Sequence, residues 1–479
     1  MGLGLSLVYL HPFLTLWECL AAAAPIGLTL STWIGVLFKS TLFRSVPGLP
    51  PSIGIVTCLL QIVISIMCFV KKSQCWSRNH TKIAKAQLLH FSLSFLPLVF
   101  LSFWLAMIHY THSLLEEGGK YHVGGSVYGD LPFHLTIITS ILHGVNQYAT
   151  PLTSGLQAAF FADSPLVYPW IPDYHAALVA GSGSTFHFAL CYPGIMLTSS
   201  FFFLLFFLYF RMTQSRRIAL MSVPITFFAG GIGGFLWLLY DGTWKTLLAE
   251  DHVLVNSLSR TIEFYWFSLP AHILFPQRTT QFAYSISLLV LIVIHKAYTS
   301  KPSPVTVFHR KSSLVIDDDL KGKNGAPKEH FTMGAVPNEH DTLKLFGAAG
   351  FICGLLPLLQ VHSFAAVGLV ILTVAFIHVV KIGGTVVKSM RTNSNLSWAF
   401  QIAKGHQLKW WLVFGIASWG IGMPQNLAFF MKVLFPTHRP SARSFLRFML
   451  ISSDFPPQGN IILLWLQALG FYVPLYLAD

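Results

Sequence analysis

Long apolar runs dominate the chain, and the connections between them are short and hold much of its charge. Runs such as 51–70, 88–109, 188–210 and 218–240 are each about 20 residues long, the length that an α-helix needs to cross a bilayer core. Apolar and polar positions do not alternate within them, as they would in a transmembrane β-strand. The pattern therefore predicts an all-α polytopic membrane protein.

We predict about ten transmembrane helices, at 11–38, 51–70, 88–109, 188–210, 218–240, 282–298, 345–361, 363–380, 410–431 and 461–477. The connection 71–87 contains five basic residues and no acid, which marks it as cytoplasmic. Alternating from there places the N-terminus, 211–217, 299–344 and 381–409 inside, with most of the 31 basic residues. Within the spans, only Glu18 places a charge near the middle of a helix.

The long connections divide the chain. Segment 299–344 is polar and contains the run Asp317–Asp319, so it is expected to be a disordered cytoplasmic linker between an N-terminal half, 1–298, and a C-terminal half, 345–479. The outer segments 110–187 and 241–281 are too long and too apolar to be linkers. Within the first of them, we expect interfacial helices at 131–143 and 155–162.

Composition supports this interpretation and excludes several others. The chain is 54% hydrophobic and only 10% charged, unlike a soluble domain, in which about a quarter of the residues are charged. The net charge of +13 resides mostly in short connections, so it is a topology signal, and no nucleic-acid partner is expected. The six cysteines have no zinc or disulfide-framework spacing, and no His-x-x-x-His pair occurs in 110–187, so we expect no metal site.

Candidate chemistry begins at Asp130, which follows a membrane span on the outer side. A carboxylate there is suited to deprotonating an acceptor that approaches from the outer compartment. If Asp130 begins a helix, His134 lies one turn later on the same face and is able to share a proton with it. The alternatives stay open, because Asp is also an ordinary N-cap and a single His on an apolar helix is more often a core residue.

A second acid, Asp163, opens the stretch Asp163-Ser-Pro-Leu-Val-Tyr168-Pro169-Trp-Ile-Pro-Asp173. From spacing alone, Tyr168-Pro169 and the prolines beside it also fit a rigid loop. Together with the Gly-Asp-x-x-x-His pattern of residues 129–134, the stretch resembles the GT-C class of membrane glycosyltransferases. Further segments resemble this class, namely His272-Ile-Leu-Phe-Pro-Gln277-Arg278, Gly354-Leu-Leu-Pro-Leu-Leu-Gln-Val-His362 and Trp465-Leu-Gln-Ala-Leu-Gly470.

This resemblance implies an integral-membrane enzyme that moves a sugar from a polyprenyl-phosphate donor to an acceptor on the non-cytoplasmic side. It implies that Asp130 is the catalytic base, with His134 beside it, and that Asp163 is a second acid bordering the acceptor. Tyr168, Pro169, His272, Gln277, Arg278 and His362 become candidate substrate-binding residues. No cofactor other than the lipid-linked donor is implied, and the membrane is the endoplasmic reticulum in a eukaryote or the inner membrane in a bacterium.

A lipid-phosphate donor requires cations at the outer surface, and arginine matches phosphate geometry best. Arg278 is one candidate. Arg439, Arg443 and Arg447 recur every four residues and share one face if they are helical. Binding of generic anionic headgroups explains the same residues.

Two other classes of function remain open. A transporter or flippase would show inverted repeats and ionisable groups at mid-membrane. A non-catalytic membrane subunit also remains, since Gln467 stands where the GT-C-like segment is expected to carry Asn.

Overall fold

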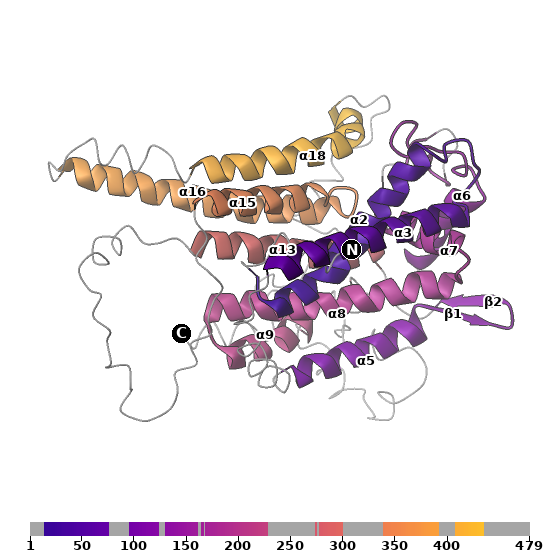
Figure 1. The fold of residues 1–479 in the computed structure, drawn as a ribbon, viewed down its shortest axis with the longest axis horizontal. Coiled ribbons are helices and arrows are strands. Elements are labelled where there is room, and N and C mark those ends of the chain that lie inside the picture. The colour runs from indigo at the N-terminus through magenta and orange to yellow at the C-terminus, as the bar shows by residue number, and fades with distance from the viewer. Residues whose placement is uncertain are drawn as a thin grey trace, which may run out of the picture.

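The computed structural model describes residues 14–75, 95–123, 130–160, 164–166, 168–228, 274, 277–299, 339–391 and 408–434. This part of the chain is mostly helical (Figure 1). Within it, five helices are long and apolar enough to cross a membrane: Leu16–Ser40, Pro51–Cys68, Phe186–Thr213, Arg278–Thr299 and Val361–Lys381. The membrane-protein class expected from the sequence agrees with this.

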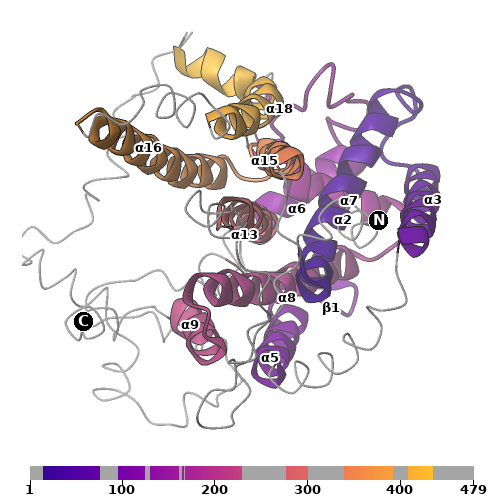
Figure 2. The same cartoon turned by 60° about the vertical axis from the view of Figure 1, so that its left-hand side comes forward.

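The bundle is built from nine helices in the described residues. They are α2 (Leu16–Ser40), α3 (Pro51–Cys75), α5 (Leu96–His112), α8 (Phe186–Thr213), α9 (Arg216–Phe228), α13 (Arg278–Thr299), α15 (Glu339–Gly354), α16 (Val361–Arg391) and α18 (Leu408–Leu434). In Figure 2, α13 lies in the middle of the bundle with α8, α2, α15 and α16 around it. Its side chains are accordingly buried over most of its length.

Local sequence signals set the ends of helices α2 and α8. The Thr15 hydroxyl accepts from the backbone N–H of Glu18, while the Glu18 carboxylate accepts from the backbone N–H of Thr15, which is a complete capping box at the start of α2. Thr185 caps α8 in a similar way through the N–H of Phe188. The same helix ends at Gln214, whose φ of 54° places it in the left-handed region.

Contacts between helix ends show the direction of each helix. Glu18, at the start of α2, binds Arg211, at the end of α8, so these two helices are antiparallel. Arg278, at the start of α13, binds the carbonyl of Leu190 near the start of α8, so α13 runs with α8. We call the two ends of the bundle the Glu18 end and the Asp173 end.

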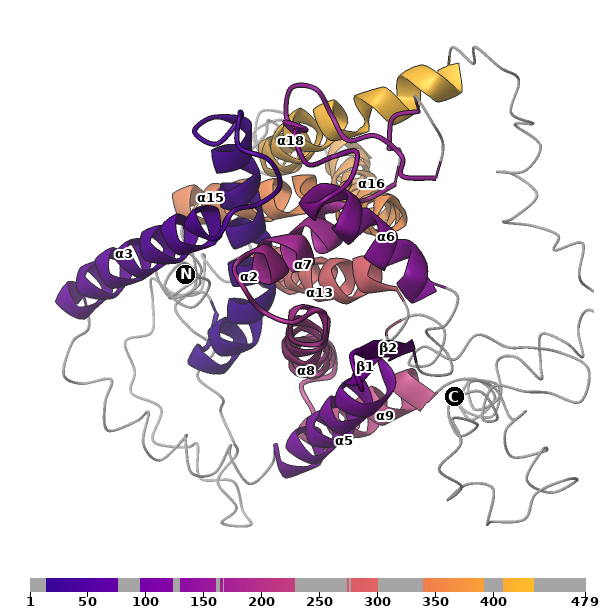
Figure 3. The same cartoon turned by 90° about the vertical axis from the view of Figure 1, so that its right-hand side faces the viewer.

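Two short helices and a hairpin cover the Asp173 end. Helix α6 (Asp130–Leu142) packs on α7 (Ile171–Gly181), and α7 in turn packs on α8 and α13 (Figure 3). Strands β1 (Leu114–Glu117) and β2 (Lys120–Val123) form an antiparallel hairpin beside the start of α8. Residues Ile171 to Leu178 of α7 are all buried, so α7 is an internal element of the bundle.

The structure corrects several expectations. Residues 155–160 form no helix, because Gly155 turns the chain at φ 70° and Gln157 pairs with Pro165 in an antiparallel bridge. Glu18 lies in the first turn of α2, not near its middle. Residues 339–344, assigned to the linker, belong to α15. A turn over 355–360 separates α15 from α16, as two crossings within 345–380 require.

The expected ten spans are matched only in part by the five membrane-length helices. Helix α5 has 17 residues and α15 has 16, which is short for a full crossing. The span expected at 461–477 and residues 229–240 of another lie outside the described residues.

Candidate functional site

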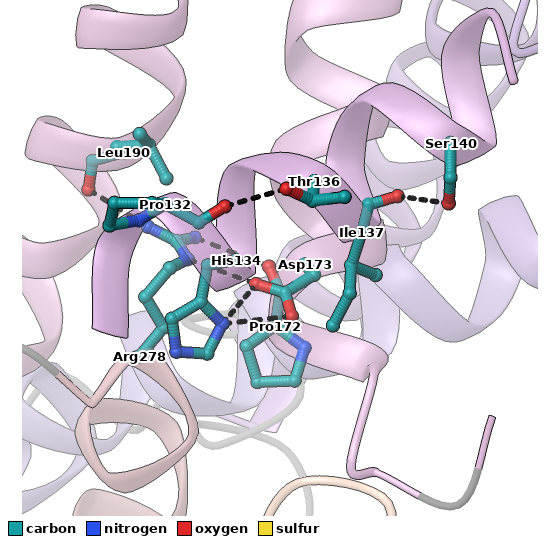
Figure 4. Close-up of polar contacts among 9 residues, drawn as sticks. All are labelled: Pro132, His134, Thr136, Ile137, Ser140, Pro172, Asp173, Leu190 and Arg278. Atoms are coloured by element: carbon teal, nitrogen blue, oxygen red, sulfur yellow. Dashed lines mark hydrogen bonds and ion pairs between the residues drawn. The ribbon is translucent and has the colours of Figure 1, made fainter. Parts of the chain in front are cut away.

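A cluster of three buried ionisable side chains lies at the Asp173 end, and we call it the Asp173 cluster. His134 comes from α6, Asp173 from the first turn of α7 and Arg278 from the first residue of α13. Their exposed fractions are 1%, 0% and 3% respectively. Figure 4 shows the three side chains converging on the Asp173 carboxylate.

The carboxylate of Asp173 is the centre of this cluster. The Nδ1 atom of His134 lies 2.9 Å from each carboxylate oxygen, and Nε of Arg278 lies 3.6 Å from Oδ1. The guanidinium also donates to the carbonyl oxygens of Leu190, at 3.3 Å, and Pro172, at 3.2 Å. A buried carboxylate without a cation is costly, so Arg278 stabilises the anion while its own hydrogen bonds tie α13 to α7 and α8.

The hydrogen bond to Asp173 fixes the tautomer of the His134 imidazole. An ionised carboxylate only accepts hydrogen bonds, so Nδ1 of His134 carries the proton that is donated to Asp173. This contact orients the ring and fastens α6 to α7 across 39 residues of sequence. His134 is therefore a positioning residue. It holds the start of α6, which lies four residues earlier in the chain.

The expected pairing of Asp130 with His134 is wrong. Asp130 begins α6 and is exposed, whereas His134 points into the bundle toward α7. Asp130 forms no hydrogen bond with the described part of the chain. No described residue therefore keeps its carboxylate from a bound molecule.

Tyr168 connects the exposed acid with the buried cluster. Its ring lies edge-on to Phe133, at 4.9 Å between centroids, and to His134, at 5.8 Å. Burial, with smaller contributions from the negative charges of Asp173 and Asp130, raises the pKa of Tyr168 to about 12, against hydrogen bonding by Thr279. The phenol consequently stays neutral at physiological pH and is able to donate a hydrogen bond.

A groove of about 690 Å³ is lined by Tyr168 and Pro169 among others, and we call it the α2–α18 groove. It lies between α2, the loop that contains Tyr168, the α15–α16 turn and α18, beside Trp33, Leu355 and Pro424. None of the described side chains that line it is charged. Pockets for small molecules span about 300–1,000 Å³ and are largely apolar, so this groove has the size and character of a binding site for an apolar group.

Other expected site residues join the α15–α16 turn to α13. Gln277 accepts from the hydroxyl of Thr280 at 3.0 Å, and Thr280 in turn accepts from the amide of Gln360 at 2.7 Å. His362, in the first turn of α16, is exposed, and the neighbouring Gln360 makes the contact instead. Asp163, His272, Arg439 and Arg443 lie outside the described residues.

The sequence pattern missed Asp173 as the partner of His134. One signal was present, since Asp173 is an acid placed one residue after a proline at the start of an otherwise apolar helix. Among the described residues, no group of three or more His, Cys, Asp or Glu side chains has an arrangement able to hold a metal ion.

The chain matches no protein-family model, no curated protein and no solved structure. The function is therefore inferred from the residues and their geometry.

Proposed function

We propose that this protein is a multi-pass membrane glycosyltransferase that uses a polyprenyl-phosphate sugar as donor and acts at the Asp173 end of the bundle. Asp130 removes the proton from the acceptor hydroxyl as the acceptor oxygen bonds to the anomeric carbon of the sugar. The bond between that carbon and the phosphate oxygen breaks, and polyprenyl phosphate leaves with the electron pair. No redox partner is required.

The observation that carries this proposal is the position of Asp130. It is an exposed carboxylate without a hydrogen bond in the described chain, and its charge acts on Tyr168, which lines an apolar groove. A donor with a hydrocarbon tail in the groove would present its sugar phosphate near Tyr168 and Asp130. The neutral Tyr168 hydroxyl is a suitable donor to a phosphate oxygen.

The Asp173 cluster supports the base without taking part in the chemistry. His134 lies one turn after Asp130, and Asp173 holds it in place. Arg278 is committed to Asp173 and to two backbone carbonyls, which favours a role in stability over the phosphate contact expected from the sequence. In this proposal, the donor phosphate is bound by Arg439 and Arg443.

The location of the buried charges favours a transferase over a transporter. Glu18 lies in the first turn of α2, Arg211 in the last turn of α8 and Arg278 at the first residue of α13. A transporter is expected to place ionisable groups near the bilayer midplane. These pairs lie at helix ends instead.

The test is donor-dependent transfer by the purified protein across a panel of polyprenyl-phosphate sugars. Asp130→Asn should lower turnover by about 10²–10⁴-fold, the usual contribution of a general base, while stability stays near parental. Glu117→Gln is the matched control, because Glu117 is another exposed carboxylate at the same end of the bundle. Full turnover of Asp130→Asn would remove Asp130 as the base, and no transfer from any donor would refute the proposed activity.

A further inference from the structure

A second cavity, of about 340 Å³, lies between α2, α3 and α7, and we call it the α3 cavity. It is separate from the α2–α18 groove and from Asp130. Its polar lining includes Ser31 of α2, Thr57 and Gln61 of α3, and His175 of α7. No charged side chain lines it.

Two of these polar groups are buried without a hydrogen-bond partner. Among the described residues, the hydroxyl of Thr57 and Nδ1 of His175 have no hydrogen-bond partner, and each residue is only 5% exposed. Leaving a buried donor or acceptor unpaired is unfavourable. Both residues line the same cavity, so a rotation of each side chain would turn these polar atoms toward one small polar group placed there.

The cavity is suited to an uncharged group. Burial, assisted by the positive charge of Arg278, lowers the pKa of His175 to about 3, so its imidazole is neutral at physiological pH. A neutral imidazole and an alcohol exchange hydrogen bonds well with a hydroxyl, which both donates and accepts. A charged headgroup would enter this space without a counter-ion.

The wall of the cavity continues into an exposed apolar face of α3. Ile55, Leu59 and Ile62 of α3 have exposed fractions of 57%, 57% and 49%. Only 11% of the apolar segment Pro51–Cys68 of this helix is buried. This outward face fits a hydrocarbon environment. A molecule with its polar end in the cavity would therefore have its apolar body along α3.

We propose that the α3 cavity binds an uncharged lipid alcohol, whose hydroxyl lies between Thr57 and His175 and whose hydrocarbon lies along α3. Sterols and diacylglycerols share this chemistry. The proposal goes beyond the transferase function and does not depend on it. Because Asp173 and His175 lie two residues apart on α7, an occupied cavity would also reinforce the helix that holds the Asp173 cluster.

Cys58 provides a reporter within the protein, because its exposed thiol lines the cavity while Cys19, Cys191 and Cys353 are buried. In detergent, the rate of maleimide labelling is measured in a Cys68→Ala, Cys75→Ala background. The probes are cholesterol and dioleoylglycerol. Each is compared with its counterpart lacking the hydroxyl, cholesteryl methyl ether and trioleoylglycerol, and dioleoylphosphatidic acid serves as the charged lipid.

We expect one alcohol to slow labelling of Cys58 by about tenfold when present at about ten times its Kd. Its counterpart and the phosphatidic acid should give no comparable protection. Thr57→Val, which removes the hydroxyl and keeps the shape, should abolish the protection, whereas Ser65→Ala on the same helix should retain it. The alcohol that protects Cys58 shows whether the cavity binds a sterol or a diacylglycerol.

Three outcomes would overturn the proposal. The first is labelling that neither alcohol slows. The second is equal protection by the hydroxyl-free or charged lipids, which would indicate general lipid coverage of α3. The third is full protection in Thr57→Val, which would exclude the hydroxyl contact.

Discussion

The bundle has a buried acid at each end, and the two acids have different surroundings. At the Glu18 end, the Arg211 guanidinium donates to both carboxylate oxygens of Glu18, at 2.5 and 2.7 Å, and Oε2 also accepts from Thr15. At the Asp173 end, the carboxylate is shared by an imidazole at 2.9 Å and a guanidinium nitrogen at 3.6 Å. The first acid has a closely matched cation, and the second is part of a looser network.

What lies beside each acid differs as well. The Glu18–Arg211 pair lies between α2 and α8. The buried Lys296 is close enough to interact electrostatically with both charges of the pair. The Asp173 cluster lies behind an exposed carboxylate and beside an apolar groove. Buried charge alone therefore does not identify a functional site. What distinguishes the two ends is an exposed group next to a binding space, without a hydrogen bond to any described residue.

The largest effect on stability should come from breaking the closed pair. Glu18→Gln leaves Arg211 buried without its counter-charge and should lower the free energy of unfolding by about 3–5 kcal/mol. Turnover per folded molecule should stay near parental, because the Glu18 end is remote from Asp130. Denaturation in detergent and transfer assays on the same preparation provide both values. A stable Glu18→Gln protein with reduced turnover would reverse the roles assigned to the two ends.

At the other end, the main effect should be on turnover. Asp173→Asn removes the charge shared by His134 and Arg278, so the start of α6 and Asp130 are held less firmly. A displacement of 1 Å costs about 10²-fold in rate, and we expect a loss of turnover of that order. His134→Asn combined with Asp173→Asn should lose little more than the single variant, because both act through one contact. Additive losses, measured as kcat, would contradict this coupling.

Substitution of Arg278 and substitution of Arg443 should have different effects on stability and turnover. Arg278→Lys loses the two bonds from the guanidinium to the carbonyls of Leu190 and Pro172, so stability should fall by roughly 1–3 kcal/mol with turnover of the folded fraction nearly unchanged. Arg443→Lys should lower turnover by about tenfold, equivalent to about 1.4 kcal/mol, if the planar fork holds the leaving phosphate. Steady-state kinetics and denaturation curves distinguish the two. Tenfold slower turnover in Arg278→Lys alone would place the phosphate at Arg278.

A further expected effect is a pH dependence at His175, which is small near neutral pH. Its folded-state pKa of about 3 lies below the ordinary value of 6.5, because burial and Arg278 disfavour the charged form. Between these values, the unfolded state binds more protons, so stability is complete above pH 6.5 and falls toward pH 3 by up to about 1.4 kcal/mol per unit. His175→Leu should flatten the curve of Tm against pH between 7.5 and 5. An unchanged slope in His175→Leu would contradict the assignment.

Much of the helical framework was accessible from the sequence. Apolar runs predict α2, α3, α8, α13 and α16, and the separate spans expected at 345–361 and 363–380 predict a break before α16. The start of α6 at Asp130 followed from an acid placed just before Leu-Pro. These features are local, so composition and periodicity were sufficient to find them.

The pairing within the site was not accessible in the same way. His134 lies one turn after Asp130, yet it binds Asp173, because α6 packs on α7 and buries His134 while Asp130 stays exposed. Nothing in the spacing of residues indicates this packing. Arg278 shows the same limitation, since the sequence placed it at the outer surface and the structure buries it against Asp173.

We propose that the donor binds at the Asp173 end, and photo-crosslinking with a photoreactive polyprenyl-phosphate sugar would test this binding site. Peptide mapping should locate the label on residues of the α2–α18 groove, such as Trp33, Pro169 and Leu355. The Glu18 end, around Arg211 and Lys296, should stay unlabelled, and excess unmodified donor should remove the label from the groove. Labelling concentrated around Arg211 and Lys296, or groove labelling that excess donor does not compete, would contradict the account.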